Sequence, residues 1–142
     1  MGREIEFRAK SIDNPVEWIF GGISFSSDGK AFIVNTGKDH LGYITIMKEV
    51  DRRTIGQYTG LKDKNGNRIF DGDIVAYCDC PASDYYRETE IANAGVILFD
   101  DAQFFVTNRQ TVEMDDLVYD GTMDCEIIGN VYDNPDLAKE VE

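Results

Sequence analysis

Residues 56–75 read Gly-Gln-Tyr-Thr-Gly-Leu-Lys-Asp-Lys-Asn-Gly-Asn-Arg-Ile-Phe-Asp-Gly-Asp-Ile-Val, and this stretch indicates how the chain folds. Asn65-Gly66 is the strongest short-range signal for a tight turn with positive φ. A second turn signal, Asp71-Gly72-Asp73, follows directly after the apolar pair Ile69-Phe70. A β-branched run then begins at Ile74. The stretch therefore predicts short strands joined by tight turns.

The same pattern continues on both sides of this stretch. Period-two alternation predicts a strand over 4–10, and apolar runs predict further strands over 18–20, 31–34, 43–47, 94–99, 104–106 and 126–132. Residues 36–39 and 79–93 are polar and predict loops. Asn134-Pro135-Asp136 predicts the start of a short helix, with Asn134 as its N-cap. These features predict a mainly β fold, either a barrel or a sandwich of short strands, with a short C-terminal helix.

Most aromatic residues fall on these expected strands, so core packing is their default interpretation. They are Phe7, Trp18, Phe20, Phe32, Tyr43, Tyr58, Tyr77 and Phe99.

Charge divides the chain into two parts. Of its 142 residues, the first 60 contain eight basic and eight acidic side chains, whereas residues 61–142 contain six basic and nineteen acidic ones. The whole net charge of −13 therefore lies in the second part. Phosphate binding needs lysine and arginine, so this balance argues against direct nucleic-acid binding by the second part. The chain shows neither a membrane-spanning apolar run nor a secretory leader, and we expect a cytoplasmic protein.

The sequence supplies no catalytic constellation, no cofactor motif and no identifiable small-molecule substrate. Cys78, Cys80, Cys125 and His40 could together form a Cys₃His zinc site, but structural zinc sites usually show two C-x₂₋₄-C pairs, which are missing here. Small buried side chains explain the cysteines as well. The alternating oxygens of residues 63–73 lack the glycine and glutamate positions of a calcium loop, so we interpret them as turn formers and expect no metal.

Two sets of residues are candidates for an interaction surface. Tyr85 and Tyr86 are adjacent aromatics in the polar stretch 79–93, a composition that suits a protein interface. The second set is an acidic cluster made up of Glu113, Asp115, Asp116, Asp120, Asp124 and Glu126.

Three blocks of the sequence resemble the YopX family of small phage and prophage proteins. They are residues 3–10 with 18–21, residues 56–75, and residues 95–97 with 126–135. The turn-forming positions of this family pattern are Gly60, Asn65, Gly66, Asp71, Gly72, Asp73, Gly129 and Asn130. The resemblance implies a phage or prophage origin, a bacterial cytoplasm and a β-rich fold, and it carries over no catalytic residue. The Gly-Asp-Ile-Val element also resembles the small SH3-like barrels.

We therefore expect one YopX-like domain over 1–142, which allows an N-terminal β subregion over 1–54 and a C-terminal β-barrel subregion over 55–142. The leading hypothesis is a non-enzymatic accessory protein that acts through a protein partner or through self-association. Two alternatives stay open. The acidic cluster could mimic DNA toward a host protein, or a barrel in residues 1–60 could bind nucleic acid through Arg8, Lys10, Lys48, Arg52 and Arg53.

Overall fold

The computed structural model describes residues 4–79, 91–108 and 118–141. The chain divides into two compact units, Met1–Tyr58 and Thr59–Glu142, here called unit 1 and unit 2. Strand β5 (Gly56–Lys62) crosses the division, because Gly56 and Gln57 pair with β1 in unit 1 and Lys62 pairs with β11 in unit 2.

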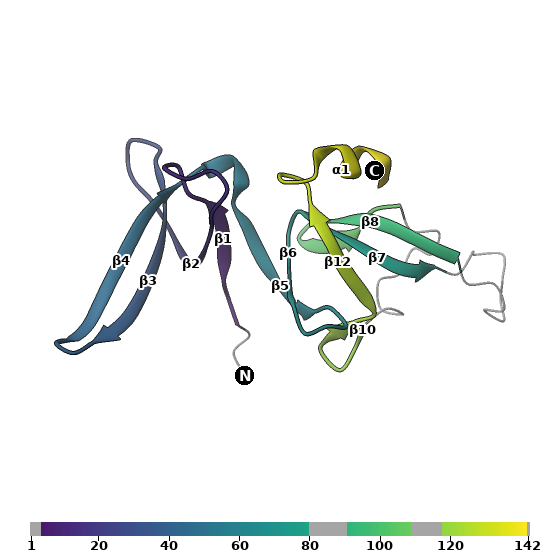
Figure 1. The fold of residues 1–142 in the computed structure, drawn as a ribbon, viewed down its shortest axis with the longest axis horizontal. Coiled ribbons are helices and arrows are strands. Elements are labelled where there is room, and N and C mark those ends of the chain that lie inside the picture. Colours follow the sequence, from purple (N-terminus) through teal and green to yellow (C-terminus); the bar gives the residue numbers. More distant parts are fainter. Residues whose placement is uncertain (1–3, 80–90, 109–117, 142) are drawn as a thin grey trace. The chain divides into compact units, whose positions relative to one another are not determined.

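Unit 1 is an antiparallel meander in which each strand pairs with the next (Figure 1). Its strands are β1 (Phe7–Lys10), β2 (Trp18–Phe25), β3 (Ala31–Asp39) and β4 (Gly42–Val50), followed by the 3₁₀ turn η1 (Arg52–Thr54). Alternation along the strands places one row of apolar side chains in a shared core. The buried members of that core are Ala9, Ile19, Ala31, Ile33 and Val50. At the base of the meander, Val50 forms an isolated bridge with Ser11, which joins the last strand to the end of the first.

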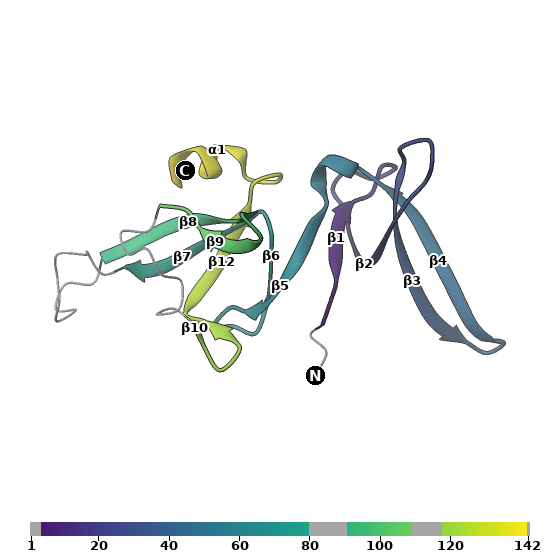
Figure 2. The same ribbon diagram turned by 180° about the vertical axis from the view of Figure 1, so that it is seen from behind.

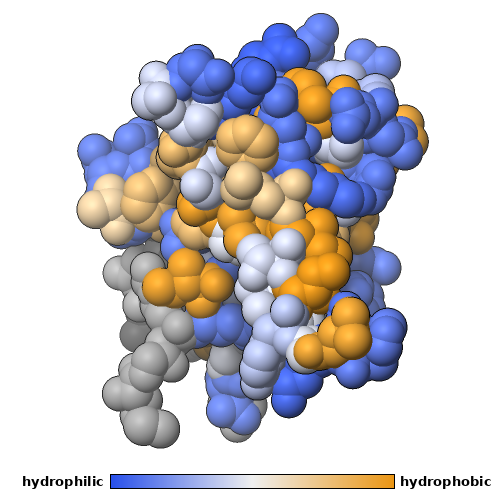
Figure 3. Space-filling view, turned by 90° about the vertical axis from the view of Figure 1, so that its left-hand side faces the viewer, coloured by the Kyte–Doolittle hydropathy of each residue, from blue (hydrophilic) through white to orange (hydrophobic). Residues whose placement is uncertain are grey.

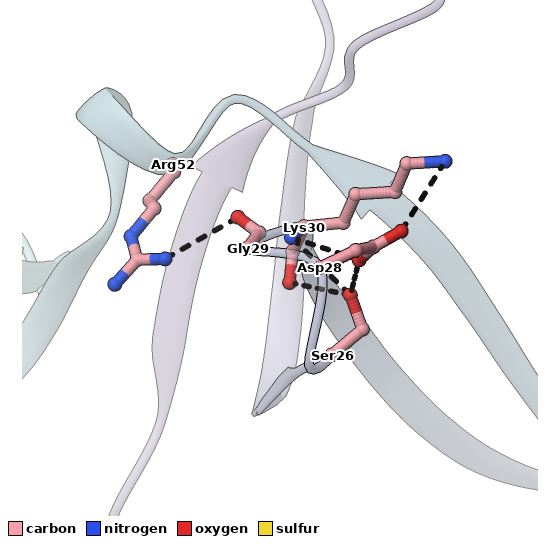
Figure 4. A network of polar contacts seen from close by, with 5 residues as sticks. All are labelled: Ser26, Asp28, Gly29, Lys30 and Arg52. Atoms are coloured by element: carbon pink, nitrogen blue, oxygen red, sulfur yellow. Dashed lines mark hydrogen bonds and ion pairs between the residues drawn. The ribbon is translucent and has the colours of Figure 1, made fainter.

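The turn between β2 and β3 is held by its own polar side chains (Figure 4). Ser26 donates its hydroxyl hydrogen to the Asp28 carboxylate, and its oxygen accepts the Lys30 amide at 3.2 Å. Arg52, from the 3₁₀ turn, donates to the carbonyl of Gly29 at 3.3 Å. These contacts hold the turn that joins the two strands between Phe25 and Ala31.

The hairpin of β3 and β4 is longer than the sequence suggested. Residues 36–39 were predicted as a loop, but β3 continues through them and pairs with β4 as far as Asp39 opposite Gly42. Strand β2 pairs with β3 only up to Val34, so the outer part of the hairpin is two strands wide. Figures 1 and 2 show it extending past β2. We call residues 35–48, all of which are exposed, the arm.

Unit 2 contains a second antiparallel sheet in the order β12-β7-β8-β9. Its strands are β7 (Asp73–Asp79), β8 (Ile91–Asp100), β9 (Gln103–Val106) and β12 (Cys125–Asn130). The end of β5 pairs with β6 (Arg68–Phe70) and with β11 (Thr122–Met123), and β11 pairs with β10 (Val118–Tyr119). The main core of unit 2 collects side chains from both groups of strands, including Ile69, Val75, Ile97 and Met123.

Helix α1 (Pro135–Val141) covers the other face of this second sheet. Its Ala138 and Val141 pack with Ile74 of β7 and Val96 of β8. Figures 1 and 2 both show the helix beside these strands. In the part of the chain that the structure describes, no helix is long and apolar enough to cross a membrane.

The predicted mainly β class and the short C-terminal helix are confirmed. Of the two architectures expected from sequence, a sandwich fits unit 2, whose two groups of strands enclose one core, and the described strands form no closed barrel. Strand β8 begins at Ile91, three residues earlier than predicted, and the short strands β10 and β11 were not predicted. With two residues each, β10 and β11 are too short to show a periodic pattern.

Candidate interaction surface

The arm presents apolar side chains on both faces of a two-stranded ribbon. Register places Ile44 and Ile46 on the face that carries the buried Ile33 and Ala31 nearer the base. Tyr43 and Met47 lie on the opposite face. The exposed fractions are 44% for Ile44, 49% for Ile46, 58% for Met47 and 77% for Tyr43. Figure 3 views the side of the molecule where β3 and β4 lie and shows apolar side chains gathered at its surface.

The default core interpretation of the aromatics is wrong for three of them. Tyr43, Phe20 and Phe99 are 77%, 43% and 53% exposed, and in Tyr43 the ring lies 5.0 Å from the ammonium of Lys38. An apolar run alone cannot distinguish a buried strand from a strand in a projecting ribbon, because the run does not say whether another element covers its apolar side chains. One sequence feature could have indicated this exposed apolar strand: residues 42–47 carry no charged side chain on either face.

Over most of its length, the outer edge of β4 has no neighbouring strand among the residues that the structure describes. Near the end of β4, the backbone carbonyl of Glu49 accepts the Ile12 amide at 3.2 Å, and Val50 forms a β-bridge with Ser11. From Gly42 to Lys48, no strand among the described residues pairs with β4 except β3. Such an edge leaves alternate amide and carbonyl groups open to another chain.

The five basic residues expected to serve a nucleic-acid site each contact a residue of unit 1. Arg8 and Lys10 lie over the Trp18 ring, at 4.6 and 5.4 Å from its centre. The other three are held separately: Lys48 lies 3.6 Å from Glu17, Arg52 stacks on Phe25 at 4.8 Å, and Arg53 forms an ion pair with Asp51 at 3.0 Å. The side-chain hydrogen bond from Arg53 is the main reason that the pKa of Asp51 is lowered.

Part of the predicted acidic cluster lies around a shallow depression in unit 2. Asp124 and Glu126 are exposed and line this depression of about 200 Å³ together with Lys64, Tyr77 and Cys78. Asp120 is also exposed, in the turn between β10 and β11, and does not line it. Glu113, Asp115, Asp116, Tyr85 and Tyr86 lie outside the described residues.

The two described cysteines differ in their environment. Cys125 pairs with Tyr77 and is buried in the core, whereas Cys78 follows Tyr77 on the strand and is exposed on the other face. Burial raises the pKa of the Cys125 thiol to about 12, and the nearby carboxylates of Asp63 and Asp124 add to the effect. A thiol that stays protonated is a poor nucleophile. Cys80 lies outside the described residues, and among the described ones no three His, Cys, Asp or Glu side chains are grouped to hold a metal.

Asp63 closes the turn that contains Asn65 and Gly66 and joins this turn to β12. It is 1% exposed, and its carboxylate accepts three amides: Asn65 at 3.0 Å, Asn67 at 2.9 Å and Ile127 at 3.1 Å. Burial alone would raise the pKa of Asp63, but these backbone donors outweigh it and the pKa is lowered. Both carboxylate oxygens therefore accept hydrogen bonds that hold the turn and β12 together.

The turn-forming positions of the family pattern have the following geometry. Gly60, Gly66 and Gly72 have φ of +90°, +84° and +92°, which favours glycine. Asp73 is 1% exposed and accepts the Phe70 amide at 2.8 Å, whereas Asp71 is half-buried.

Asn65 and Gly66 are exposed in the turn that Asp63 closes. At the end of β12, the side-chain oxygen of Asn130 accepts the backbone amides of Tyr132 and Asp133. The backbone amide of Asn130 donates to the side-chain oxygen of Asn134 at 3.1 Å. A side chain at Gly129 would clash with Asn134, since an added Cβ would lie 2.5 Å from the Asn134 oxygen.

A comparison with models of known protein families shows which family this chain belongs to. A family model described as YopX protein matches residues 6–139. The chain belongs to the YopX family. Its fold is similar to the crystal structure of protein EF1440 from Enterococcus faecalis, with a TM-score of 0.56 and 24% sequence identity, over 96% of this chain and 99% of that one. At this identity the likeness of the YopX chain to EF1440 shows the fold alone. A comparison with curated proteins finds no match.

Proposed function

We propose that the protein is a non-enzymatic accessory protein of a phage or prophage and that it acts through protein contacts made by the arm. The observation that carries this proposal is the exposure of Tyr43, Ile44, Ile46 and Met47 on a ribbon that leaves the core of unit 1. Several exposed large apolar side chains close together, as on the two faces of this ribbon, are typical of interaction sites in soluble proteins. The uncharged open edge of β4 adds main-chain hydrogen-bonding groups to this surface.

The chemistry of the described residues supports a binding role over catalysis. The depression in unit 2 offers two carboxylates, a lysine and an exposed thiol. The single histidine of the chain, His40, is exposed at the tip of the arm. The residues that line the depression include no histidine, so they provide no cysteine–histidine pair to activate a nucleophile.

Photo-crosslinking inside a bacterial host carrying the protein tests the proposal. Benzoylphenylalanine replaces Tyr43 in the arm, and the control carries it at Ser27, an exposed residue of the turn between β2 and β3. We expect discrete protein adducts from position 43 that are absent from position 27 and that survive nuclease treatment. Equal labelling at both positions would contradict the proposal. Adducts that disappear with nuclease would favour the nucleic-acid alternative.

A further inference from the structure

The open edge of β4 carries a side-chain pattern that is its own complement. Residues 43–47 read Tyr-Ile-Thr-Ile-Met, so isoleucines flank Thr45 on both sides and a large side chain follows on each side. Two copies of an antiparallel strand related by a two-fold axis at Thr45 would place Ile44 opposite Ile46 of the other copy. The same axis would place Tyr43 opposite Met47.

We propose that the arm pairs with a second copy of this chain, edge to edge along β4, about a two-fold axis at Thr45. This inference rests on the proposed function and names the partner of the same surface. Directly opposed residues share a face of the sheet. On one face the pairing brings together Ile44 and Ile46 of both copies, and on the other an aromatic–methionine pair lies on each side of the two threonines.

The charges fit this register. Residues 42–47 are uncharged, and the first charged side chain of the strand, Lys48, would lie opposite Gly42 of the second copy. No like charges therefore meet within the paired segment. One register step in either direction would place one isoleucine of each copy opposite threonine, and a two-step slip would leave a single isoleucine pair. The proposed register therefore gives the fullest apolar match.

A pair of short strands is a small interface, and we expect dissociation constants of about 1–100 µM. The net charge of −13 opposes association of two copies. Salt screens that repulsion and leaves apolar contacts in place, so we expect the dimer to strengthen between about 50 and 500 mM NaCl. A basic foreign partner held by charge would show the opposite dependence.

Disulfide trapping tests the register. In a full-length chain with Cys78 and Cys80 changed to serine, Thr45→Cys is expected to give a disulfide-linked dimer on mild oxidation, because the two residues at position 45 would face each other within bridging distance. Tyr43→Cys alone should stay monomeric, whereas a mixture of Tyr43→Cys and Met47→Cys should cross-link. The matched control is Thr36→Cys. Thr36 lies opposite Thr45 on β3 of the same copy and is also exposed, but it is one strand farther from the axis.

Sedimentation of the unaltered protein provides an independent measurement. We expect a concentration-dependent dimer, and Ile46→Lys should weaken it by at least about 100-fold, because the substitution places two charges in the shared apolar cluster. Equal cross-linking at positions 45, 43 and 36 would overturn the inference, and so would a monomer at every concentration. A monomer that still forms foreign adducts from Tyr43 in cells would overturn self-pairing and leave the proposed function standing.

Discussion

Removal of the Asp63 carboxylate should destabilise unit 2 more than any other loss of a single carboxylate discussed above. Its oxygens accept three backbone amides at 2.9–3.1 Å while the residue is 1% exposed. A hydrogen bond to a charged group contributes about 1.5–3 kcal/mol, and a buried amide left without a partner costs about 1–3 kcal/mol. The desolvation of the buried carboxylate offsets part of this gain. We therefore expect Asp63→Ala to lower the free energy of unfolding by about 3–4 kcal/mol.

The assay combines urea unfolding with hydrogen exchange. Far-UV circular dichroism reports the free energy of unfolding, and exchange of the Ile127 amide reports the hydrogen bond that joins the turn to β12. Asp63→Asn keeps one acceptor oxygen and should lose about 1–2 kcal/mol. Asp124→Asn is the matched control, because Asp124 is exposed, and should change stability by less than about 0.5 kcal/mol. If Asp63→Ala lies within that same range, the reasoning about Asp63 is refuted.

The lowered pKa of Asp63 also predicts a pH dependence. In the folded chain this pKa lies below its ordinary value of 3.8, so the folded state binds this proton less readily than the unfolded state does. The resulting stabilisation is complete above the unfolded pKa and is lost as the pH falls through the folded pKa. We expect the stability difference between the native protein and Asp63→Asn to shrink below about pH 4. A difference that stays constant from about pH 6 to pH 2 would contradict the assignment.

Two further predictions concern packing and thiol reactivity. Gly95→Ala should destabilise the protein by about 2 kcal/mol or more in urea unfolding, because the added Cβ would lie 2.1 Å from the Thr107 carbonyl oxygen; an unchanged midpoint would show that the strands there can separate. In a Cys80→Ser background, a disulfide reagent at about pH 8 should label Cys78 in the folded protein and reach Cys125 only on unfolding, since Cys125 is buried with a thiol pKa of about 12. Rapid labelling of both thiols in the folded protein would contradict that burial.

Local sequence chemistry determined most of the strands and the helix. The turn over residues 26–29, the glycines with positive φ and the Pro135 helix start depend on neighbouring residues, because the constraints of glycine, proline and Asx side chains act over a few positions. The family pattern could be recognised for the same reason, since it consists largely of such turns.

The length of β3 could not be read in the same way. Gly37 and Asp39 have weak strand propensity. They lie in β3 because β4 pairs with β3 from Ala31 as far as Asp39. A strand partner that lies several residues away overrides a local loop signal.

What only the tertiary structure decided is which apolar faces are covered. Ile33 and Ile46 lie on the same face of one hairpin. Ile33 belongs to the core of unit 1 and is 1% exposed, whereas Ile46 lies on the arm, outside that core, and is 49% exposed. Both residues belong to apolar runs that predict strands, so the sequence identified them equally well as strand residues. Burial depends on whether another element packs over the site, and that is a property of the whole fold. The arm, and with it the candidate interaction surface, became visible only when the strands were placed in space.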